Sequence, residues 1–353
     1  MKPFSESDLN WMRQALALAR RGEGLTRPNP PVGAVVVKNG RKIGQGWHRK
    51  AGGPHAEIFA LRQAGAAARG ATLYVTLEPC STFGRTPPCT DAILRAGIAR
   101  VVVAAVDPNP RHAGRGLRLL RKAGLQVATG ACGAEAAELI APFACRMLRN
   151  RPFFTLKLGL SLDGRIADHA HSSRWITGPQ ARATVQAMRR AADAVMVGAG
   201  TVRHDDPSLW PRPDGKRQPW RVVVVRRAPL PLDAQLFTDE HAARTIVAAP
   251  KGWQPACARR IRQTGATVLE FPPRRLLPAL AAELGRLGLL RVLCEGGGIL
   301  AGELIRAGLI DELCVFVSPV LIGGSVGAMG KTQWPLRQAP RFRLRESRLV
   351  GQD

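Results

Sequence analysis

Hydrophobic and polar positions alternate along the first third of the chain in a way that predicts helices and strands in turn. Apolar residues recur at helical spacing over residues 8–21, which predicts an amphipathic helix. Short apolar runs predict strands, and Asn39-Gly40 between two of them is typical of a hairpin turn. The expected strands are 32–37, 42–47, 72–76 and 100–105, and the further helices are 55–66, 89–96 and 116–123. This alternation predicts a sheet with helices on both faces.

The pattern breaks near residues 146–152 and then starts again. Residues 211–219 are rich in proline and charge, so they are expected to form an exposed loop. A glycine run, Gly296 to Gly298, separates an expected strand from an expected helix. The other elements expected beyond the break are a helix at 180–191 and strands at 153–160, 194–197, 220–225, 245–248, 291–295 and 313–317. We therefore expect two α/β domains, residues 1–146 and 147–353.

The net charge of +26 suggests an anionic partner such as nucleic acid, a membrane surface or a phosphorylated small molecule. Lysine and arginine are scattered in short pairs, however, so a generally basic, solvated surface is the simpler interpretation. No uncharged apolar run reaches the length of about 18 residues that predicts a membrane span, and residues 1–20 contain no signal-peptide core. Seven irregularly spaced cysteines favour free thiols in the cytoplasm over a disulfide framework.

Three short segments of the first half carry residues that suit a catalytic zinc ion: His55-Ala-Glu57, Pro79-Cys80 and Cys89. One imidazole and two thiolates leave the fourth position of zinc open for water, whose pKa the metal lowers to about 7. Glu57 is close enough to His55 to reach that water without ligating the metal, and it could carry the proton to departing ammonia. A structural zinc site would need a fourth ligand. His48 is a candidate, but it suits a substrate contact better.

The wider motifs of this half resemble the bifunctional riboflavin-biosynthesis deaminase/reductase family. They are Thr26-Arg-Pro-Asn-Pro-Pro-Val-Gly33, Gly52-Gly-Pro-His-Ala-Glu57, Thr76-Leu-Glu-Pro-Cys80 and Gly84-Arg-Thr-Pro-Pro-Cys89. The cysteines are nine apart, whereas the general zinc-deaminase signature places them three apart. The wide spacing is characteristic of this family.

The resemblance implies a cytidine-deaminase-like three-layer α/β/α domain with one zinc ion per chain. His55, Cys80 and Cys89 would be the zinc ligands, and Glu57 the catalytic proton shuttle. Substrate contacts are implied for Asn29, His48 and Arg85. The family usually has histidine and then histidine or tyrosine where this chain has Thr82 and Phe83. This departure leaves the zinc ligands intact but would allow a shifted substrate or a slower deamination.

The second half resembles the reductase domain of the same family, which has a dihydrofolate-reductase-like α/β fold. The motifs are Leu156-Lys-Leu-Gly-Leu-Ser-Leu-Asp-Gly-Arg165, Ser173-Arg-Trp-Ile-Thr177, Val197-Gly-Ala-Gly-Thr-Val202, Asp205-Asp-Pro207 and Glu295-Gly-Gly-Gly298. A glycine turn before a helix lets the backbone approach a pyrophosphate, although this is not the Rossmann spacing. The resemblance implies NADPH contacts from Gly159, Trp175, Thr201, Asp205, Gly297 and Gly298. It implies contacts to a phosphorylated ribosylaminopyrimidine from Ser173, Arg189, Leu209, Arg212 and Glu295.

Without the family context, Trp175 would be read as a core aromatic residue and Arg189 as a solvated helix charge. Lys157 and Glu295 are the candidates for polarising the sugar and managing its proton. Arg226-Arg227 replace an aspartate and a small residue of the family, and we expect that one of them, Arg227, binds the 2′-phosphate of NADPH. The alternative is that both arginines point to solvent. Further departures are Trp210, where threonine is usual, and Asp168, His169 and His171.

The expected function is two consecutive reactions. Zinc-bound hydroxide would remove the 2-amino group of 2,5-diamino-6-ribosylamino-4(3H)-pyrimidinone 5′-phosphate, and NADPH would then reduce the ribosyl C1′ to give 5-amino-6-ribitylaminouracil 5′-phosphate. A diverged paralogue with one active half, or with another pyrimidine substrate, is the alternative. An RNA-binding or RNA-editing deaminase would suit the charge, but the scattered arginines, the cysteine spacing and the second half argue against it. We expect a cytoplasmic homo-oligomer without a membrane partner.

Overall fold

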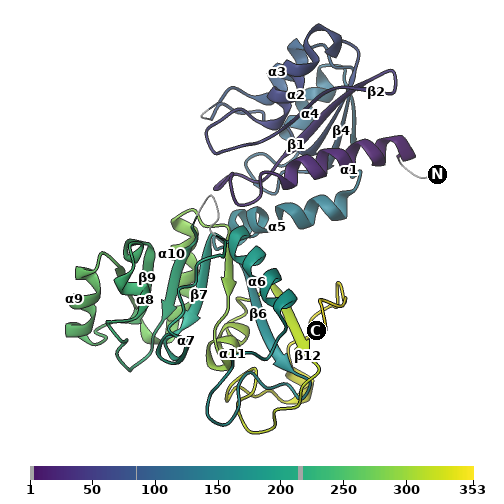
Figure 1. Ribbon diagram of the computed structural model, residues 1–353. Helices are drawn as coiled ribbons and strands as arrows, with labels where there is room; N and C mark the ends of the chain where they lie inside the picture. Colours follow the sequence, from purple (N-terminus) through teal and green to yellow (C-terminus); the bar gives the residue numbers. More distant parts are fainter. Residues whose placement is uncertain (1–3, 85, 214–217) are drawn as a thin grey trace. The chain divides into compact units, whose positions relative to one another are not determined.

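The computed structural model describes residues 4–84, 86–213 and 218–353, and the chain folds into two compact units (Figure 1). The first is Met1–Asn150 and the second is Arg151–Asp353. Each has its own sheet, its own apolar core and its own candidate site, so each is described separately.

The first unit is built on a five-stranded sheet, within the described residues, in the order β2-β1-β3-β4-β5. The central strand β3 (Thr72–Leu77) pairs antiparallel with β1 (Gly33–Lys38) and parallel with β4 (Arg100–Ala105). The edges are β2 (Arg41–Trp47), antiparallel to β1, and β5 (Gln126–Thr129), parallel to β4. Asn39 and Gly40 join β1 to β2 with φ of 49° and 70°, the left-handed pair that a two-residue hairpin turn requires. The hairpin expected from the sequence is confirmed.

Helices cover both faces of this sheet. On one face, α1 (Glu6–Arg20) and α5 (Gly133–Arg149) pack Met12, Leu16 and Leu139 against the strands. On the other face, α2 (Ala56–Ala64), α3 (Cys89–Arg95) and α4 (Arg115–Lys122) pack against the alternate strand residues. This is the three-layer arrangement that the sequence predicts, and it places the start of α2, the start of α3 and the end of β3 together.

The second unit has a seven-stranded sheet in the described part of the chain, in the order β10-β9-β8-β7-β11-β6-β12, with every neighbouring pair parallel. Its strands are β6 (Phe153–Ser161), β7 (Ala194–Gly198), β8 (Trp220–Val224), β9 (Thr245–Pro250), β10 (Thr267–Phe271), β11 (Arg291–Cys294) and β12 (Glu312–Ser318). A parallel sheet needs crossover helices and is covered on both faces, which explains the nearly continuous apolar strands.

Successive strand residues of this sheet feed two different cores. Phe154, Leu156 and Met196 join the core under α10 (Leu276–Arg286) and α11 (Gly298–Arg306). Val195 and Val197 join the core under α7 (Ala199–Asp205), α8 (Gln235–Thr238) and α9 (Pro255–Gln263). The helix α6 (Pro179–Ala191) packs against β12. Short 3₁₀ turns lie at Gly65–Ala68, Ala242–Arg244, Pro273–Arg275 and Leu336–Gln338. Among the described residues, no helix is both long and apolar enough to cross a membrane.

Candidate active sites

Three candidate zinc ligands meet at the ends of three elements of the first unit. His55 is the N-cap residue of α2, Cys89 begins α3, and Cys80 follows β3. His55 Nδ1 lies 3.2 Å from Cys89 Sγ and 3.5 Å from Cys80 Sγ, and the three ligand atoms all fall within 4.8 Å of one another. Ligand atoms around a tetrahedral zinc ion are about 3.5 Å apart, so this spacing fits.

The protonation of the cluster also suits a bound cation. Hydrogen bonding from the Cys89 thiol, helped by His55, lowers the pKa of Cys80 to about 4. The hydrogen bond to Cys80 and burial raise the pKa of Cys89. Without a cation, Cys80 is therefore the thiolate and Cys89 the thiol that donates to it. A divalent cation between them would stabilise both residues as thiolates.

Glu57 lies beside this cluster in the first turn of α2, and its side chain is buried. Burial raises the pKa of its carboxyl group. Its Oε2 atom has no hydrogen-bond partner among the described residues, which is rare for a buried oxygen and points to a bound group that completes it. Since Glu57 is not among the three ligating residues, it suits proton transfer rather than metal ligation.

The predicted substrate contacts Asn29 and His48 lie next to the cluster. His48 donates from Nδ1 to the Pro54 carbonyl (3.1 Å) and accepts at Nε2 from the Asn29 amide (3.0 Å). Burial lowers the pKa of His48, so its ring is neutral. Its ring packs edge-on against His55 with centroids 5.2 Å apart. Because both ring nitrogens are engaged, His48 does not supply a fourth ligand. Arg85, the third predicted contact, lies outside the described residues.

Glu78 supports this site, and sequence reasoning missed it. Its buried carboxylate accepts the backbone N–H groups of Gly114 (2.8 Å) and Gly116 (2.8 Å). It thereby caps the start of α4 and ties that helix to the segment that carries Cys80. A charged residue inside an otherwise buried stretch, two positions before a ligand, was the available signal.

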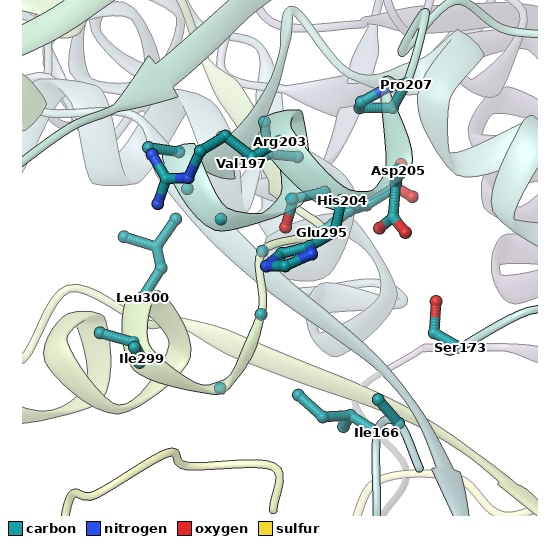
Figure 2. Close-up of a pocket in the computed structure, with 18 of the residues that line it drawn as sticks. Ile166, Ser173, Val197, Arg203, His204, Asp205, Pro207, Glu295, Ile299 and Leu300 are labelled. Carbon is teal, nitrogen blue, oxygen red and sulfur yellow. The ribbon is translucent and has the colours of Figure 1, made fainter. Parts of the chain in front are cut away.

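The second unit contains a cavity of about 1830 Å³ at the carboxyl ends of its strands. Figure 2 shows Ser173, Asp205 and Glu295 around it, with Ile299 and Leu300 at the start of α11. Every predicted site residue of this half lines the cavity: Lys157, Gly159, Ser173, Trp175, Arg189, Thr201, Asp205, Leu209, Arg212, Arg227, Glu295, Gly297 and Gly298. Crevices at this edge of an open parallel sheet are where ligands of α/β proteins bind.

A largely buried ion pair forms part of the cavity wall. Arg189 of α6 donates from Nε and Nη2 to both oxygens of Glu295, at 2.6 and 2.9 Å. The nearby Lys157 is half-buried, and desolvation lowers its pKa, although the Glu295 carboxylate opposes this effect. Arg189 is therefore not a solvated helix charge. Trp175 is 69% exposed beneath the Arg182 guanidinium, so it is not a core residue either.

The glycine turn after β11 leaves backbone open to the cavity. A side chain on Gly298 would meet the Gly327 carbonyl oxygen at 2.4 Å, so that residue must stay small. At Gly297, the N-cap residue of α11, a Cβ atom would meet nothing closer than 4.0 Å. The start of α11 therefore offers N–H groups to an anion in the cavity.

The cavity lining is strongly cationic. Among its described residues, lysine and arginine outnumber aspartate and glutamate by nine to four. Arg226 and Arg227 both line it, and Arg226 is paired with Glu303 at 2.8 Å. Arg203 and Lys331 also line it, and sequence reasoning did not single them out. The residues suit a ligand with several phosphate groups.

The chain matches known proteins over almost its whole length. The family model described as the RibD C-terminal domain matches residues 152–353, and the zinc-binding region of cytidine and deoxycytidylate deaminases matches residues 5–105. The riboflavin biosynthesis protein RibD of Aquifex aeolicus is 41% identical, with 99% of this chain and 97% of the relative covered. The chain belongs to the RibD family. The RibD of Escherichia coli is 43% identical over 98% of this chain and 97% of its own length.

Solved structures of RibD proteins agree with the fold. Acinetobacter baumannii RibD superposes with a TM-score of 0.87 at 42% identity, covering 98% of this chain and 97% of that one. A diaminohydroxyphosphoribosylaminopyrimidine deaminase/5-amino-6-(5-phosphoribosylamino)uracil reductase from Thermotoga maritima gives 0.84 at 35% identity, covering 96% and 95%. The sequence expectations of a riboflavin-biosynthesis deaminase and reductase, and of its two α/β folds, are confirmed. The zinc-binding type of the first domain is confirmed with them.

Proposed function

We propose that this RibD protein catalyses two consecutive reactions on a phosphorylated ribosylaminopyrimidine. The first removes the 2-amino group of 2,5-diamino-6-ribosylamino-4(3H)-pyrimidinone 5′-phosphate, and the second reduces the ribosyl C1′. The observation that carries the proposal is that one chain contains both sites. One is a His–Cys–Cys cluster beside a buried carboxyl group, and the other is a cationic cavity that contains a largely buried Arg–Glu pair. The Thermotoga maritima relative is named for the same two activities.

In the first unit, His55, Cys80 and Cys89 would hold one zinc ion per chain. Zinc supplies a Lewis acid that lowers the pKa of water to about 7. Glu57 would accept one water proton on its unpartnered oxygen and deliver it to the ring nitrogen. It would then carry the second proton, from the added hydroxyl group, to the amino group, which leaves as ammonia. Asn29 and the neutral His48 would orient the pyrimidine ring. Arg85 would bind the substrate phosphate through two parallel hydrogen bonds.

In the second unit, NADPH supplies the hydride. Lys157 would polarise the ribosyl oxygen, and Glu295 would manage its proton while holding Arg189 in place. Ser173, Arg189, Leu209 and Arg212 would bind the substrate. These groups all lie along one cavity, which is large enough for the cofactor and the pyrimidine together.

The strand order supports one orientation of the cofactor. The Gly297–Gly298 turn follows β11 and would hold the pyrophosphate at the start of α11. Gly159 lies on β6, on one side of β11, and Arg227 follows β8, on the other side. Trp175 and Gly159 would therefore contact the nicotinamide half, Thr201 and Asp205 the middle, and Arg227 the 2′-phosphate.

A homo-oligomer and a cytoplasmic location belong to the same proposal. The edge strand β12 exposes Val315 and Val317, and the segment after it exposes Leu321, Leu344 and Leu349. An apolar edge of this extent is typical of a surface that a second copy covers, and light scattering would measure the mass. All seven cysteines are free thiols, which a reducing compartment maintains.

The experiment that tests the proposed function follows ammonia and NADPH separately. The zinc-loaded protein is supplied with the diaminopyrimidinone phosphate and NADPH. Both ammonia release and NADPH oxidation are expected. Release of ammonia alone, or oxidation only with a pre-deaminated substrate, would instead identify a paralogue with one active half. The absence of both ammonia release and NADPH oxidation would contradict the proposal.

A further inference from the structure

The loop of residues 206–212, which lines the reductase cavity, has a conformation that its own sequence does not favour. Asp206 and Leu209 have φ of 37° and 61°, in the left-handed region that residues other than glycine rarely adopt. Leu209 is nevertheless almost completely buried. Contacts elsewhere must therefore hold this loop in place.

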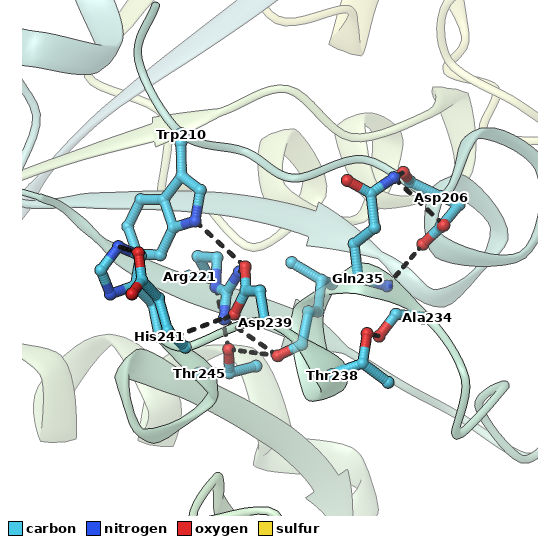
Figure 3. Close-up of polar contacts among 11 residues, drawn as sticks. Asp206, Trp210, Arg221, Ala234, Gln235, Thr238, Asp239, His241 and Thr245 are labelled. Atoms are coloured by element: carbon cyan, nitrogen blue, oxygen red, sulfur yellow. Dashed lines mark hydrogen bonds and ion pairs between the residues drawn. The ribbon is translucent and has the colours of Figure 1, made fainter. Parts of the chain in front are cut away.

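The two ends of the loop are held by different partners. At its start, the Asp206 carboxylate accepts the Gln235 backbone N–H (2.9 Å), and the Asp206 carbonyl accepts the Gln235 side-chain amide (2.8 Å). At its far end, the Trp210 indole N–H donates to the Asp239 carboxylate (3.1 Å). Figure 3 shows these two attachments on opposite sides of the same group of residues.

Asp239 is a firm anchor because a buried arginine fixes it. Arg221 of β8 is fully buried and donates from both terminal nitrogens to Asp239, and its other donors reach Thr245 Oγ1 and the Leu236 carbonyl. Its guanidinium also stacks on the Trp210 ring, 4.5 Å from the centroid. Burial alone would raise the pKa of Asp239, but Arg221 and Trp210 outweigh burial, and the pKa of Asp239 lies below its usual range.

The anchored end of the loop reaches the substrate side of the cavity. The Trp210 carbonyl accepts from Arg189 Nη1 (3.2 Å), and the same guanidinium holds Glu295. Leu209 and Arg212 flank Trp210 and line the cavity, whereas Trp210 itself does not. One connected series of contacts thus runs from the interior of the sheet to the substrate side of the cavity, through Arg221, Asp239, Trp210, Arg189 and Glu295.

We infer that Trp210 is a positioning residue for the pyrimidine substrate of the reductase. Its indole N–H, held by Asp239, fixes the neighbouring Leu209 and positions the guanidinium of Arg189. The backbone of Arg212 is held in addition by Gln186 and Arg190 of α6. The start of the loop, next to Asp205, is held independently by Gln235, so Trp210 acts on the pyrimidine and not on NADPH. This inference rests on the proposed reductase function.

The test compares Trp210→Phe with wild type, using 5-amino-6-(5-phosphoribosylamino)uracil and NADPH. Phenylalanine keeps an aromatic ring next to Arg221 and removes the N–H donor together with one ring of the indole. We expect KM for the uracil compound to rise on the order of 10-fold, which corresponds to about 1.4 kcal/mol, as one lost hydrogen bond to a charged group would produce. The KM for NADPH and kcat should stay within about two-fold of wild type, since the loop start is untouched.

A second variant tests the path through Asp239. Asp239→Asn weakens the acceptor, so it should raise the same KM, and adding Trp210→Phe to it should have a much smaller effect than in wild type. The control is His241→Ala. It removes a ring that packs edge-on against Trp210, 4.8 Å between centroids, while keeping the backbone N–H that Asp239 accepts. This control should leave both KM values unchanged.

The outcomes separate this inference from the proposed function. A wild-type protein that does not oxidise NADPH with the uracil compound contradicts both. An active wild type whose Trp210→Phe variant shows an unchanged KM, or equal rises for both substrates, contradicts the positioning role alone. Fully additive effects of the Trp210 and Asp239 changes would also overturn it. NADPH binding by each variant shows that the second unit is folded.

Discussion

At the scale of single residues, burial determines the chemistry of the side chains that matter most. Glu57 is buried and Lys157 is half-buried, and desolvation moves their pKa values in opposite directions, up for the carboxyl and down for the amine. The residue types and their spacing predicted both as catalytic groups. The unpartnered Glu57 oxygen and the supporting role of Glu78 could not be predicted, because they depend on contacts between distant segments.

Replacing Glu57 with glutamine should stop ammonia release while zinc remains bound. The amide has nearly the same shape but cannot take up a proton, so deamination should fall by at least about 100-fold. Ammonia release and zinc content by elemental analysis measure the two effects. NADPH oxidation with the pre-deaminated substrate is the control and should persist. Deamination within a few-fold of wild type would show that another group moves the proton.

The pH dependence of the reductase kcat/KM should reflect the protonation of the Lys157 amine. The protonated amine is the form that polarises the sugar, and desolvation lowers its pKa from 10.5. Its charge, and with it the reductase kcat/KM, should therefore be lost as pH rises through a value below 10.5. In Lys157→Arg, whose guanidinium stays charged, this alkaline decline should disappear from the profile. An identical decline in the variant would exclude Lys157 as its source.

Arg227 should select NADPH over NADH. A charge-assisted contact with the 2′-phosphate is worth roughly 1.5–3 kcal/mol, so Arg227→Ala should raise KM for NADPH roughly 10-fold to 100-fold and leave NADH almost unaffected. Arg226→Ala is the matched comparison, because Arg226 is already paired with Glu303. Equal rises in KM for both cofactors, or no rise for either, would indicate that Arg227 points to solvent.

At the scale of elements, strong periodicity was predictive and weak or broken periodicity was not. The strands of both sheets other than β5 and β10, and the helices α1, α2, α3, α4 and α6, lie within a few residues of their predicted ranges. Sequence reasoning missed β5, a four-residue edge strand without a fully buried face. It also missed α5, which contains Pro142 in its interior, and α10, which follows the Pro272-Pro273 pair. In these elements tertiary packing outweighs the local signal.

The attachment of α1 to the sheet should depend on Asp8. Its carboxylate accepts two hydrogen bonds from Arg100, at 2.7 and 3.1 Å, and one from Tyr74 at 2.8 Å. Asp8→Asn should therefore lower the free energy of unfolding of the first unit by about 1–3 kcal/mol at neutral pH. Urea denaturation of the two proteins measures the difference.

The pH dependence of that difference has a definite sign. Hydrogen bonds from Arg100 hold the pKa of Asp8 well below its ordinary value of 3.8. The stabilisation is therefore present above the unfolded-state pKa and is lost as pH falls below it toward the folded-state value. The gap between wild type and Asp8→Asn should shrink below about pH 4. A gap that stays constant or widens in acid would show that the carboxylate is not the stabilising group.

At the scale of the whole molecule, one chain holds two folded units, each with candidate groups for one reaction. The sequence motifs predicted which residues belong to each site, and in the second unit the structure gathers all of them around one cavity. The sequence could not predict the cavity's excess of lysine and arginine, because residues such as Arg203 and Lys331 come from different segments. Nor did the sequence predict that Asp239 would hold the Trp210 indole. That contact depends on the buried Arg221 of β8, which lies two strands away from β11 in the sheet.

Isotope transfer tests the central claim most directly. The zinc-loaded protein is incubated with the diaminopyrimidinone phosphate, ¹⁸O-labelled water and NADPH deuterated at the transferred position. If both sites act in turn, the ribitylaminouracil phosphate will carry ¹⁸O at the carbon that lost its amino group and deuterium at C1′. A product that lacks either label, or no turnover, would contradict the account of one chain that performs both reactions.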